Sequence, residues 1–287
     1  MAKNFSDRLD RALRDRQTFL TVGLDPRPGG FPEPLQGAPE AEALREYLLG
    51  IVGATRESCV AFKMQLASYF AFGIDGLRLL SEIRREIGTD VLTVLDLKAA
   101  DIPSTMELYR TGVFERLGFD AMTVNPYLGW ETVEAALGNS PNGVFVLLHT
   151  SNPGSQDFQE LTLASGAKLW RSLLPRIRSL ADSGNVGAVV GATYPEALAE
   201  ARTGLGPCVP LLVPGVGRQG GRLEDVLRTG LGESGGALLI NASRSILEAS
   251  RDVDWKEAAR REAARLTSEM RTLSAALPGG SARTSHA

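Results

Sequence analysis

The stretch VLTVLDLKAAD, residues 91–101, sets the pattern from which the fold can be predicted. Its first half is apolar except for Thr93 and is rich in β-branched residues, which is typical of a strand buried on both faces. Its second half carries charges at Asp96, Lys98 and Asp101, and a helical pattern follows near residues 103–117. The stretch therefore predicts a parallel strand whose carboxyl end bears polar side chains and leads into a helix.

The same unit, an apolar β-rich run followed by a helical pattern, recurs along the chain. Between residues 19 and 240 there is one run for about every 28 residues, which fits the strand–helix repeat of a (β/α)8 barrel. We therefore predict an α/β fold, a TIM barrel formed by a single domain over residues 1–276, with an N-terminal helix near 3–16 and a disordered tail at 277–287. The eight predicted strands are Phe19–Leu24, Val60–Met64, Val91–Leu95, Ala121–Val124, Val144–Leu148, Ala188–Gly191, Val209–Val213 and Ala237–Ile240. The other predicted helices lie near residues 40–57, 74–87, 103–117, 130–138, 164–182, 195–203, 222–231 and 254–276.

Charge and hydropathy exclude several classes of partner. The chain has 31 basic and 34 acidic residues, a net charge of −3, and such a balance provides no basic field for nucleic acid or an anionic membrane surface. It contains no run of about 18 apolar residues and no signal-peptide pattern near its first residue. We therefore expect a cytoplasmic protein that acts on a small molecule.

Histidine, cysteine and lysine are scarce, with two His, two Cys and five Lys in 287 residues. Cys59, Cys208, His149 and His286 cannot form a four-ligand zinc site of ordinary spacing, and we predict neither a metal site nor a disulfide framework. A histidine-based triad could use only His149, which we expect to be a packed strand-end residue. The chemistry is therefore expected to depend on Lys and Asp.

Polar residues stand where the predicted strands end, which is where a barrel keeps its catalytic groups. They are Asp25, Lys63, Asp96 with Lys98, Asn125, Ser151 and Arg244. For any one of them a simpler explanation is that loops begin there and loops are polar. The combination of Lys63, Asp96, Lys98 and Asp101 is stronger, because charges in an apolar setting must be paired. The alternative for this set is a structural ion pair or, for Asp101, a helix cap.

A glycine-rich loop, PGVGRQGG at residues 214–221, follows the seventh predicted strand. Its glycines Gly215, Gly217 and Gly220 expose backbone N–H groups ahead of a helix, which suits a phosphate. The same spacing also matches a dinucleotide-binding fingerprint, but that motif belongs in the first βαβ unit, and only one strand follows here. A phosphate site formed by the loops after strands seven and eight is common in barrels, and Arg244 would supply the cation.

Four segments together resemble the orotidine 5'-phosphate decarboxylase family, in particular its longer bacterial branch. They are VLDLKAADIPST at 94–105, AFKMQ at 61–65, PGVGRQGG at 214–221 and HTSNPG at 149–154, and the resemblance covers about residues 19–247. Two departures are small: Met64 stands where the family pattern has proline, and residues 241–244 are longer than the Gly-Arg ending of the shorter branch.

The resemblance implies a role for each matching residue. Lys98 would donate the proton within a charge network completed by Asp96 and Asp101. Asp101 and Thr105 would enter the site of a neighbouring subunit, which implies a homodimer. The reaction implied is conversion of orotidine 5'-monophosphate to uridine 5'-monophosphate and CO2, with no cofactor or metal. The implied substrate contacts are Asp25 and Lys63 for the ribose, Ser151 for the pyrimidine, Gln219 and Arg244 for the phosphate, and Asn125 as a weaker candidate.

Three alternatives are open at this stage. A related barrel decarboxylase or aldolase that acts on a sugar phosphate with Mg²⁺ would share the Asp96-x-Lys98-x-x-Asp101 spacing, but Lys63 stands where we would expect those relatives to carry Glu. An NADP-dependent oxidoreductase would use the glycine loop with Arg244. A non-catalytic phosphate-binding barrel would have no need of the Asp/Lys/Asp set.

Overall fold

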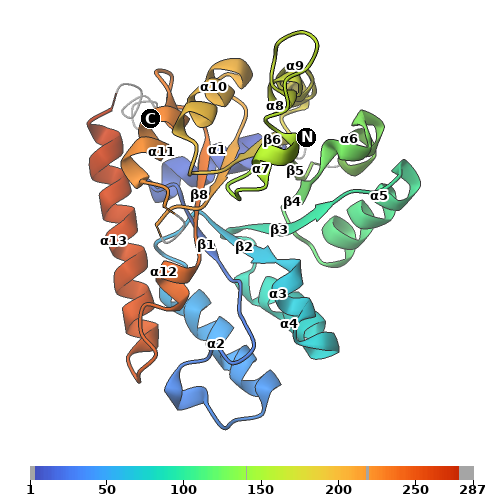
Figure 1. Ribbon diagram of the computed structural model, residues 1–287. Coiled ribbons are helices and arrows are strands. Elements are labelled where there is room, and N and C mark those ends of the chain that lie inside the picture. The colour runs from blue at the N-terminus through green and yellow to red at the C-terminus, as the bar shows by residue number, and fades with distance from the viewer. Residues whose placement is uncertain (1–3, 140, 218–219, 278–287) are drawn as a thin grey trace.

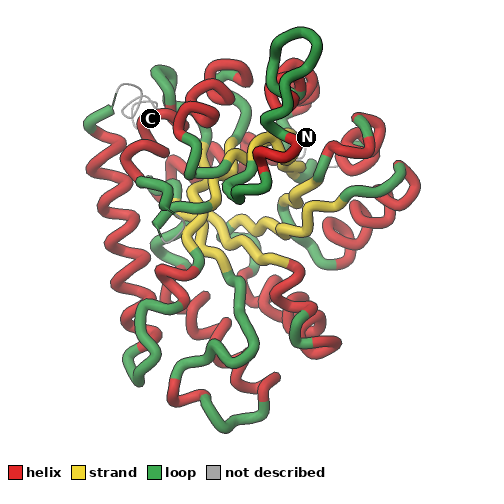
Figure 2. The backbone as a smooth tube through the Cα atoms, viewed as in Figure 1, coloured by secondary structure: helices red, strands yellow, loops and turns green. Residues whose placement is uncertain are grey.

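The structure, a computed structural model, describes residues 4–139, 141–217 and 220–277. Eight parallel strands close into a barrel in chain order, with β8 paired to β1, and helices surround them (Figures 1 and 2). This confirms the predicted (β/α)8 fold. The strands are β1 Leu20–Gly23, β2 Ala61–Gln65, β3 Leu92–Ala99, β4 Ala121–Val124, β5 Gly143–His149, β6 Val186–Val190, β7 Leu211–Pro214 and β8 Leu238–Ala242.

The helices follow the predicted order with three differences. The helix predicted near 164–182 is instead two short helices, because Pro175 has no N–H to donate and so interrupts the helical hydrogen bonding. The helix predicted near 103–117 changes to a π-helical segment, Thr111–Arg116, after its first eight residues. Three short helices, α3, α7 and α12, were not predicted. The α-helices are α1 Phe5–Arg16, α2 Glu40–Thr55, α3 Leu66–Phe70, α4 Gly73–Ile87, α5 Pro103–Arg110, α6 Trp130–Leu137, α7 Ser155–Phe158, α8 Leu169–Ser172, α9 Leu174–Leu180, α10 Pro195–Leu205, α11 Leu223–Leu231, α12 Arg244–Leu247 and α13 Trp255–Ala275.

Helix α1 packs against the apolar residues that fill the barrel interior. Asn4 caps α1 by accepting a hydrogen bond from the backbone N–H of Asp7 at 2.8 Å. The buried face of the helix presents Phe5 and Leu9 to a cluster of inward-facing strand residues, and the Phe5 ring meets Phe145 edge-on at 5.6 Å. Gly143 permits this contact, because a Cβ there would stand 2.6 Å from the Phe5 ring. This apolar packing leaves the carboxyl ends of the strands as the place for a polar cavity.

A second apolar layer lies between the strands and the outer helices. Outward-facing residues such as Val22, Phe62 and Ile240 are fully buried there against the helices. Burying each such side chain contributes about 1.5–3 kcal/mol to the transfer free energy, so this layer holds the barrel closed.

Among the described residues, no helix is long and apolar enough to cross a membrane. Residues 278–287, most of the predicted tail, lie outside the described residues.

Candidate active site

A cavity of about 520 Å³ lies at the carboxyl ends of the strands. Its lining is divided by chemistry. Charged side chains come from β2 and β3 and from the segments after β1 and β8, and hydroxyl groups come from β4, from α3 and from the segments after β5 and β8, whereas β5, β6 and β7 contribute the apolar residues Leu147, Val189 and Leu212. The cavity can therefore hold a molecule that is charged along one side and apolar along the other.

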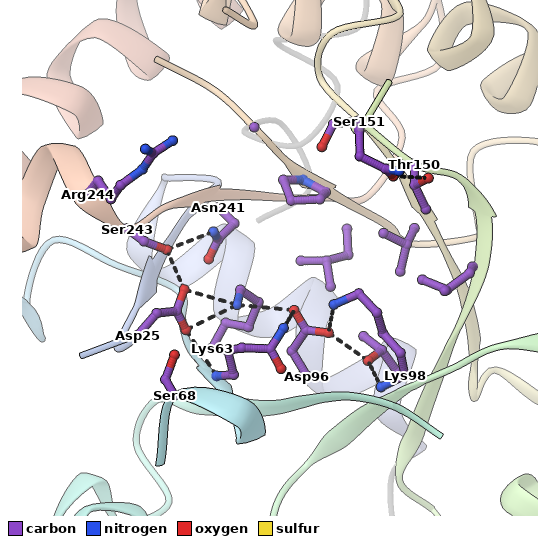
Figure 3. A pocket seen from close by; sticks show the side chains of 18 of the residues that line it. Asp25, Lys63, Ser68, Asp96, Lys98, Thr150, Ser151, Asn241, Ser243 and Arg244 are labelled. Carbon is purple, nitrogen blue, oxygen red and sulfur yellow. Dashed lines mark hydrogen bonds and ion pairs between the residues drawn. The ribbon is translucent and has the colours of Figure 1, made fainter. Parts of the chain in front are cut away.

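Lys63 lies at the centre of the charged wall, between two carboxylates (Figure 3). Its Nζ is 3.3 Å from both carboxylate oxygens of Asp25 and 3.2 Å from Oδ2 of Asp96. Only 4% of the Lys63 side chain is exposed. Burial alone would lower the pKa of Lys63, but the two carboxylates outweigh it and raise the pKa above its ordinary value. Lys63 is therefore a fixed buried cation at neutral pH.

Lys98 approaches the same carboxylate from the other side. Its Nζ is 2.7 Å from Oδ1 of Asp96, and the Thr123 hydroxyl donates to that oxygen at 2.8 Å. Burial would raise the pKa of Asp96, but the charges of Lys63 and Lys98 and these hydrogen bonds lower it to about 2. The Lys98 side chain is 42% exposed, so its ammonium reaches the cavity while Asp96 stays ionised beneath it.

Asp25 is held by the segment that follows β8. Ser243 donates its hydroxyl to Oδ2 of Asp25 at 2.7 Å, and the Asn241 amide donates to Ser243 at 3.1 Å. The Gln65 backbone N–H donates to Oδ1 at 3.0 Å. Gly23 makes this closure possible, because a Cβ there would lie 1.9 Å from the Ser243 hydroxyl oxygen.

The predicted phosphate loop lies beside the cavity. Gly215 and Arg244 line the cavity, and Ser151 lines it from the loop after β5. Gly215, Gly217 and Gly220 have φ angles of 102°, 82° and 96°, a region that favours glycine. Gly217 and Gly220 do not line the cavity; the Gly220 N–H donates to the Gly217 carbonyl at 2.8 Å and tightens the loop. Gln219 lies outside the described residues.

Besides Gly217 and Gly220, three more predicted site residues do not line this cavity. Asn125 uses its side-chain oxygen to accept from the Tyr127 N–H at 3.1 Å, which caps the short 3-10 helix Pro126–Leu128. Asp101 accepts from the Ile102 N–H at 2.8 Å, and Thr105 lines a separate apolar groove on the outer surface. Asp101 and Thr105 are the two residues expected to serve a neighbouring subunit.

His149 is fully buried at the end of β5 and is not among the residues that line the cavity. It packs edge-on against Trp170 and Tyr194, and its Nε2 lies 2.7 Å from a Glu160 carboxylate oxygen. This is the packed strand-end environment that we expected.

Sequence reasoning missed several polar residues of the cavity. Thr123 stands two positions before Asn125 on the same strand face, and this alternation was the signal that could have revealed it. Asn241 and Ser243 lie within residues 241–244, but the family resemblance implied a role only for Arg244 in this segment. Gln65 and Arg27 also line the cavity, and Arg27 comes from the Pro/Gly-rich loop after β1, where no periodic pattern indicates direction.

A closed parallel barrel with charged groups and a glycine-rich loop at the carboxyl ends of its strands defines a TIM-barrel enzyme. A family model described as "Orotidine 5'-phosphate decarboxylase / HUMPS family" matches residues 18–261, and the chain belongs to this family.

Individual relatives agree with this assignment. The orotidine 5'-phosphate decarboxylase of Thermomicrobium roseum is 42% identical over 265 residues, covering 92% of this chain and 93% of the relative. That of Bordetella pertussis is 41% identical over 257 residues, covering 89% and 93%. Among solved structures, the OMP decarboxylase of Leishmania donovani matches with a TM-score of 0.78 at 34% identity, covering 94% of this chain and 99% of that one.

Proposed function

We propose that the protein converts orotidine 5'-monophosphate to uridine 5'-monophosphate and CO2, as a step of pyrimidine biosynthesis in the cytoplasm. The names of relatives that are 41–42% identical over most of the chain support the substrate. The observation that carries the chemistry is the partly exposed Lys98 ammonium, held at the cavity by an Asp96 carboxylate that stays ionised.

The substrate would lie across the cavity with its charged groups on the polar wall. The phosphate would bind Arg244 beside the loop that begins at Gly215, since a guanidinium suits a dianion. The ribose hydroxyls would bind Asp25 and Lys63, and the pyrimidine would extend toward Ser151 and the apolar wall. This arrangement would put the carboxylate-bearing carbon of the ring near Lys98.

Decarboxylation breaks the bond between the ring carbon and the carboxylate, releases CO2 and leaves the electron pair on the carbon. The Lys98 ammonium stabilises that developing negative charge and then gives its proton to the carbon. The resulting neutral amine takes a proton from water to complete the cycle. Asp96 holds the ammonium in place through their 2.7 Å contact, and the charge of Asp96 would lie close to the substrate carboxylate that is about to leave.

The donor set also supports a reaction without a metal. A divalent cation bound at Asp25 and Asp96 would need the space between their carboxylates, and the Lys63 ammonium lies there at 3.2–3.3 Å from both. In the Mg²⁺-dependent alternative that position needs an acidic ligand. Turnover in excess chelator separates the two reactions.

The fold argues against the dinucleotide alternative. The glycine loop follows β7 of a closed barrel and bonds to itself through a bridge between Val216 and Gly221. A dinucleotide fingerprint needs the first strand of an open doubly wound sheet.

Replacing Lys98 with Ala tests the chemistry. We expect kcat to fall by at least about three orders of magnitude, because both charge stabilisation and the proton donor are lost. Asp96 keeps its ion pair with Lys63, so urea unfolding should show a folded variant. Near-normal decarboxylation by Lys98→Ala would remove the proposed mechanism.

We further propose that the enzyme is a homodimer in which Asp101 and Thr105 reach the neighbouring site. An apolar groove of about 330 Å³ between α3 and α5 is lined by Thr105 together with Leu108 and Tyr109. Leu108 is 71% exposed, and most of the other residues that line the groove, such as Leu66 and Val113, are apolar as well. Apolar side chains gathered at one surface mark a protein interface.

Mixing inactive variants tests the shared site. Lys98→Ala and Asp101→Ala homodimers should each be impaired, and their mixture should recover activity through hybrids that contain one intact site. Fluorescence-detected subunit exchange serves as the control. Demonstrated exchange without recovery would place the whole site within one chain.

A further inference from the structure

Thr123 is the residue of β4 that faces the charged segment of β3. Between the pairs Leu95–Met122 and Ala99–Val124, β3 contributes three residues and β4 contributes only Thr123. The register shift makes β3 bulge at this point and interrupts the regular ladder of backbone hydrogen bonds. Thr123 is only 1% exposed, yet it lines the cavity.

The Thr123 hydroxyl makes hydrogen bonds to β3 where the backbone ladder is interrupted. It accepts a hydrogen bond from the Lys98 backbone N–H at 2.9 Å and donates one to Oδ1 of Asp96 at 2.8 Å. A hydroxyl can donate one hydrogen bond, and here the Asp96 carboxylate accepts it. The side chain therefore joins the two charged residues of the bulge and has no donor left for a substrate.

The backbone of Lys98 shows why this bond matters. Its φ angle is 50°, in the left-handed region that is unfavourable for a residue with a Cβ. The Lys98 ammonium bonds to the same Asp96 oxygen that receives the Thr123 hydroxyl. Without the hydroxyl, the Lys98 N–H would lose its acceptor, and the Asp96 carboxylate would lose the donor that fixes its orientation from β4.

We propose that Thr123 is a positioning residue for the decarboxylation: its hydroxyl holds the Lys98 backbone and the Asp96 carboxylate in one arrangement, so that the ammonium is fixed against the reacting carbon. This inference rests on the proposed function. Thr123 acts through Lys98 and Asp96 and does not contact the substrate.

The variant Thr123→Val keeps the shape of the side chain and removes the hydroxyl. We expect kcat to fall about 10- to 100-fold, because a displacement of about 1 Å at a reacting group costs that much. KM should change less than about twofold, since the hydroxyl makes no substrate contact. Thr123→Ser, which keeps the hydroxyl, should recover most of the lost kcat.

The pH profile gives a readout that a purely structural residue would not move. The hydrogen bond from Thr123 helps to keep the pKa of Asp96 low against the effect of burial. In Thr123→Val the pKa of Asp96 should rise, so the acid limb of kcat should move to higher pH, and Thr123→Ser should move it back.

An unchanged kcat in Thr123→Val would overturn the proposal, and a rise in KM alone would indicate that Thr123 contacts the substrate directly. If the valine variant does not fold, Thr123→Ala provides the same comparison.

An activity-independent measurement separates this proposal from the proposed function. Between pH 5 and 3 the urea midpoint of Thr123→Val should fall less than that of the wild type, even if neither decarboxylates orotidine 5'-monophosphate. Urea midpoints that fall equally in the variant and the wild type would contradict the proposed effect of Thr123 on Asp96.

Discussion

Replacing Lys63 with Met removes the cation that separates two carboxylates in the cavity wall. Lys63 is buried and lies 3.2–3.3 Å from oxygens of Asp25 and Asp96, so the substitution removes the cation that Asp25 pairs with and leaves two carboxylates facing each other, although Asp96 keeps its ion pair with Lys98. Breaking a buried pair in this way costs about 3–5 kcal/mol of the free energy of unfolding. We expect a loss of that size at pH 7.

The pH dependence of that loss follows from Asp96. In the wild type its pKa is about 2 instead of the ordinary 3.8, and at 1.36 kcal/mol per pH unit this corresponds to about 2 kcal/mol of stability. A lowered pKa gives stability that is present above pH 4 and lost as the pH falls toward 2. In Lys63→Met the pKa of Asp96 should rise, so acidification should remove less of the free energy of unfolding than it does in the wild type. The difference in this free energy between the variant and the wild type should therefore narrow between about pH 5 and 2. The raised pKa of Lys63 affects stability only in the alkaline range and adds nothing to this slope.

Urea unfolding at a series of pH values from 7 to 3 measures both quantities. Lys256→Met is the matched control, because Lys256 forms an exposed ion pair with Glu46 at 3.4 Å, worth about 1 kcal/mol or less. Equal losses in the two variants at pH 7, or a Lys63→Met deficit that stays constant down to pH 3, would refute the reasoning.

Two further predictions concern substrate binding. Gly23→Ala would place a Cβ 1.9 Å from the Ser243 hydroxyl oxygen and displace that hydroxyl from Asp25. Because Asp25 would lose a hydrogen bond to its charged group, KM should rise about tenfold or more. An unchanged KM in steady-state kinetics would contradict the role of Ser243 in holding Asp25. Arg244→Ala should raise KM for orotidine 5'-monophosphate about 100-fold, while slow turnover of orotidine, which has no phosphate, should be the same in variant and wild type. An equal effect on both substrates would mean that Arg244 does not bind the phosphate.

The barrel could be predicted because each strand is a local signal. Four of the five residues at 91–95 are apolar and the fifth is Thr93, and such a β-rich run is typical of a strand covered on both faces. The short helices α3 and α12 could not be predicted, since four or five residues give no helical periodicity.

The site residues that could be predicted are those whose position at the end of a strand decides which way the side chain points. Asp25, Lys63, Asp96 and Lys98 are brought together at one cavity because parallel strands end at the same face. The alternation along β4 could have placed Thr123 at the cavity, but its contacts with Lys98 and Asp96 depend on a β-bulge in β3, and such a register shift is decided by pairing between strands and not by local sequence.

Metal-independent decarboxylation is tested most directly by incubating the wild-type protein with orotidine 5'-monophosphate in excess chelator and following the loss of ultraviolet absorbance together with the products. We predict stoichiometric uridine 5'-monophosphate and CO2 at a rate that Mg²⁺ does not increase. No product, or product only after Mg²⁺ is restored, would contradict the account.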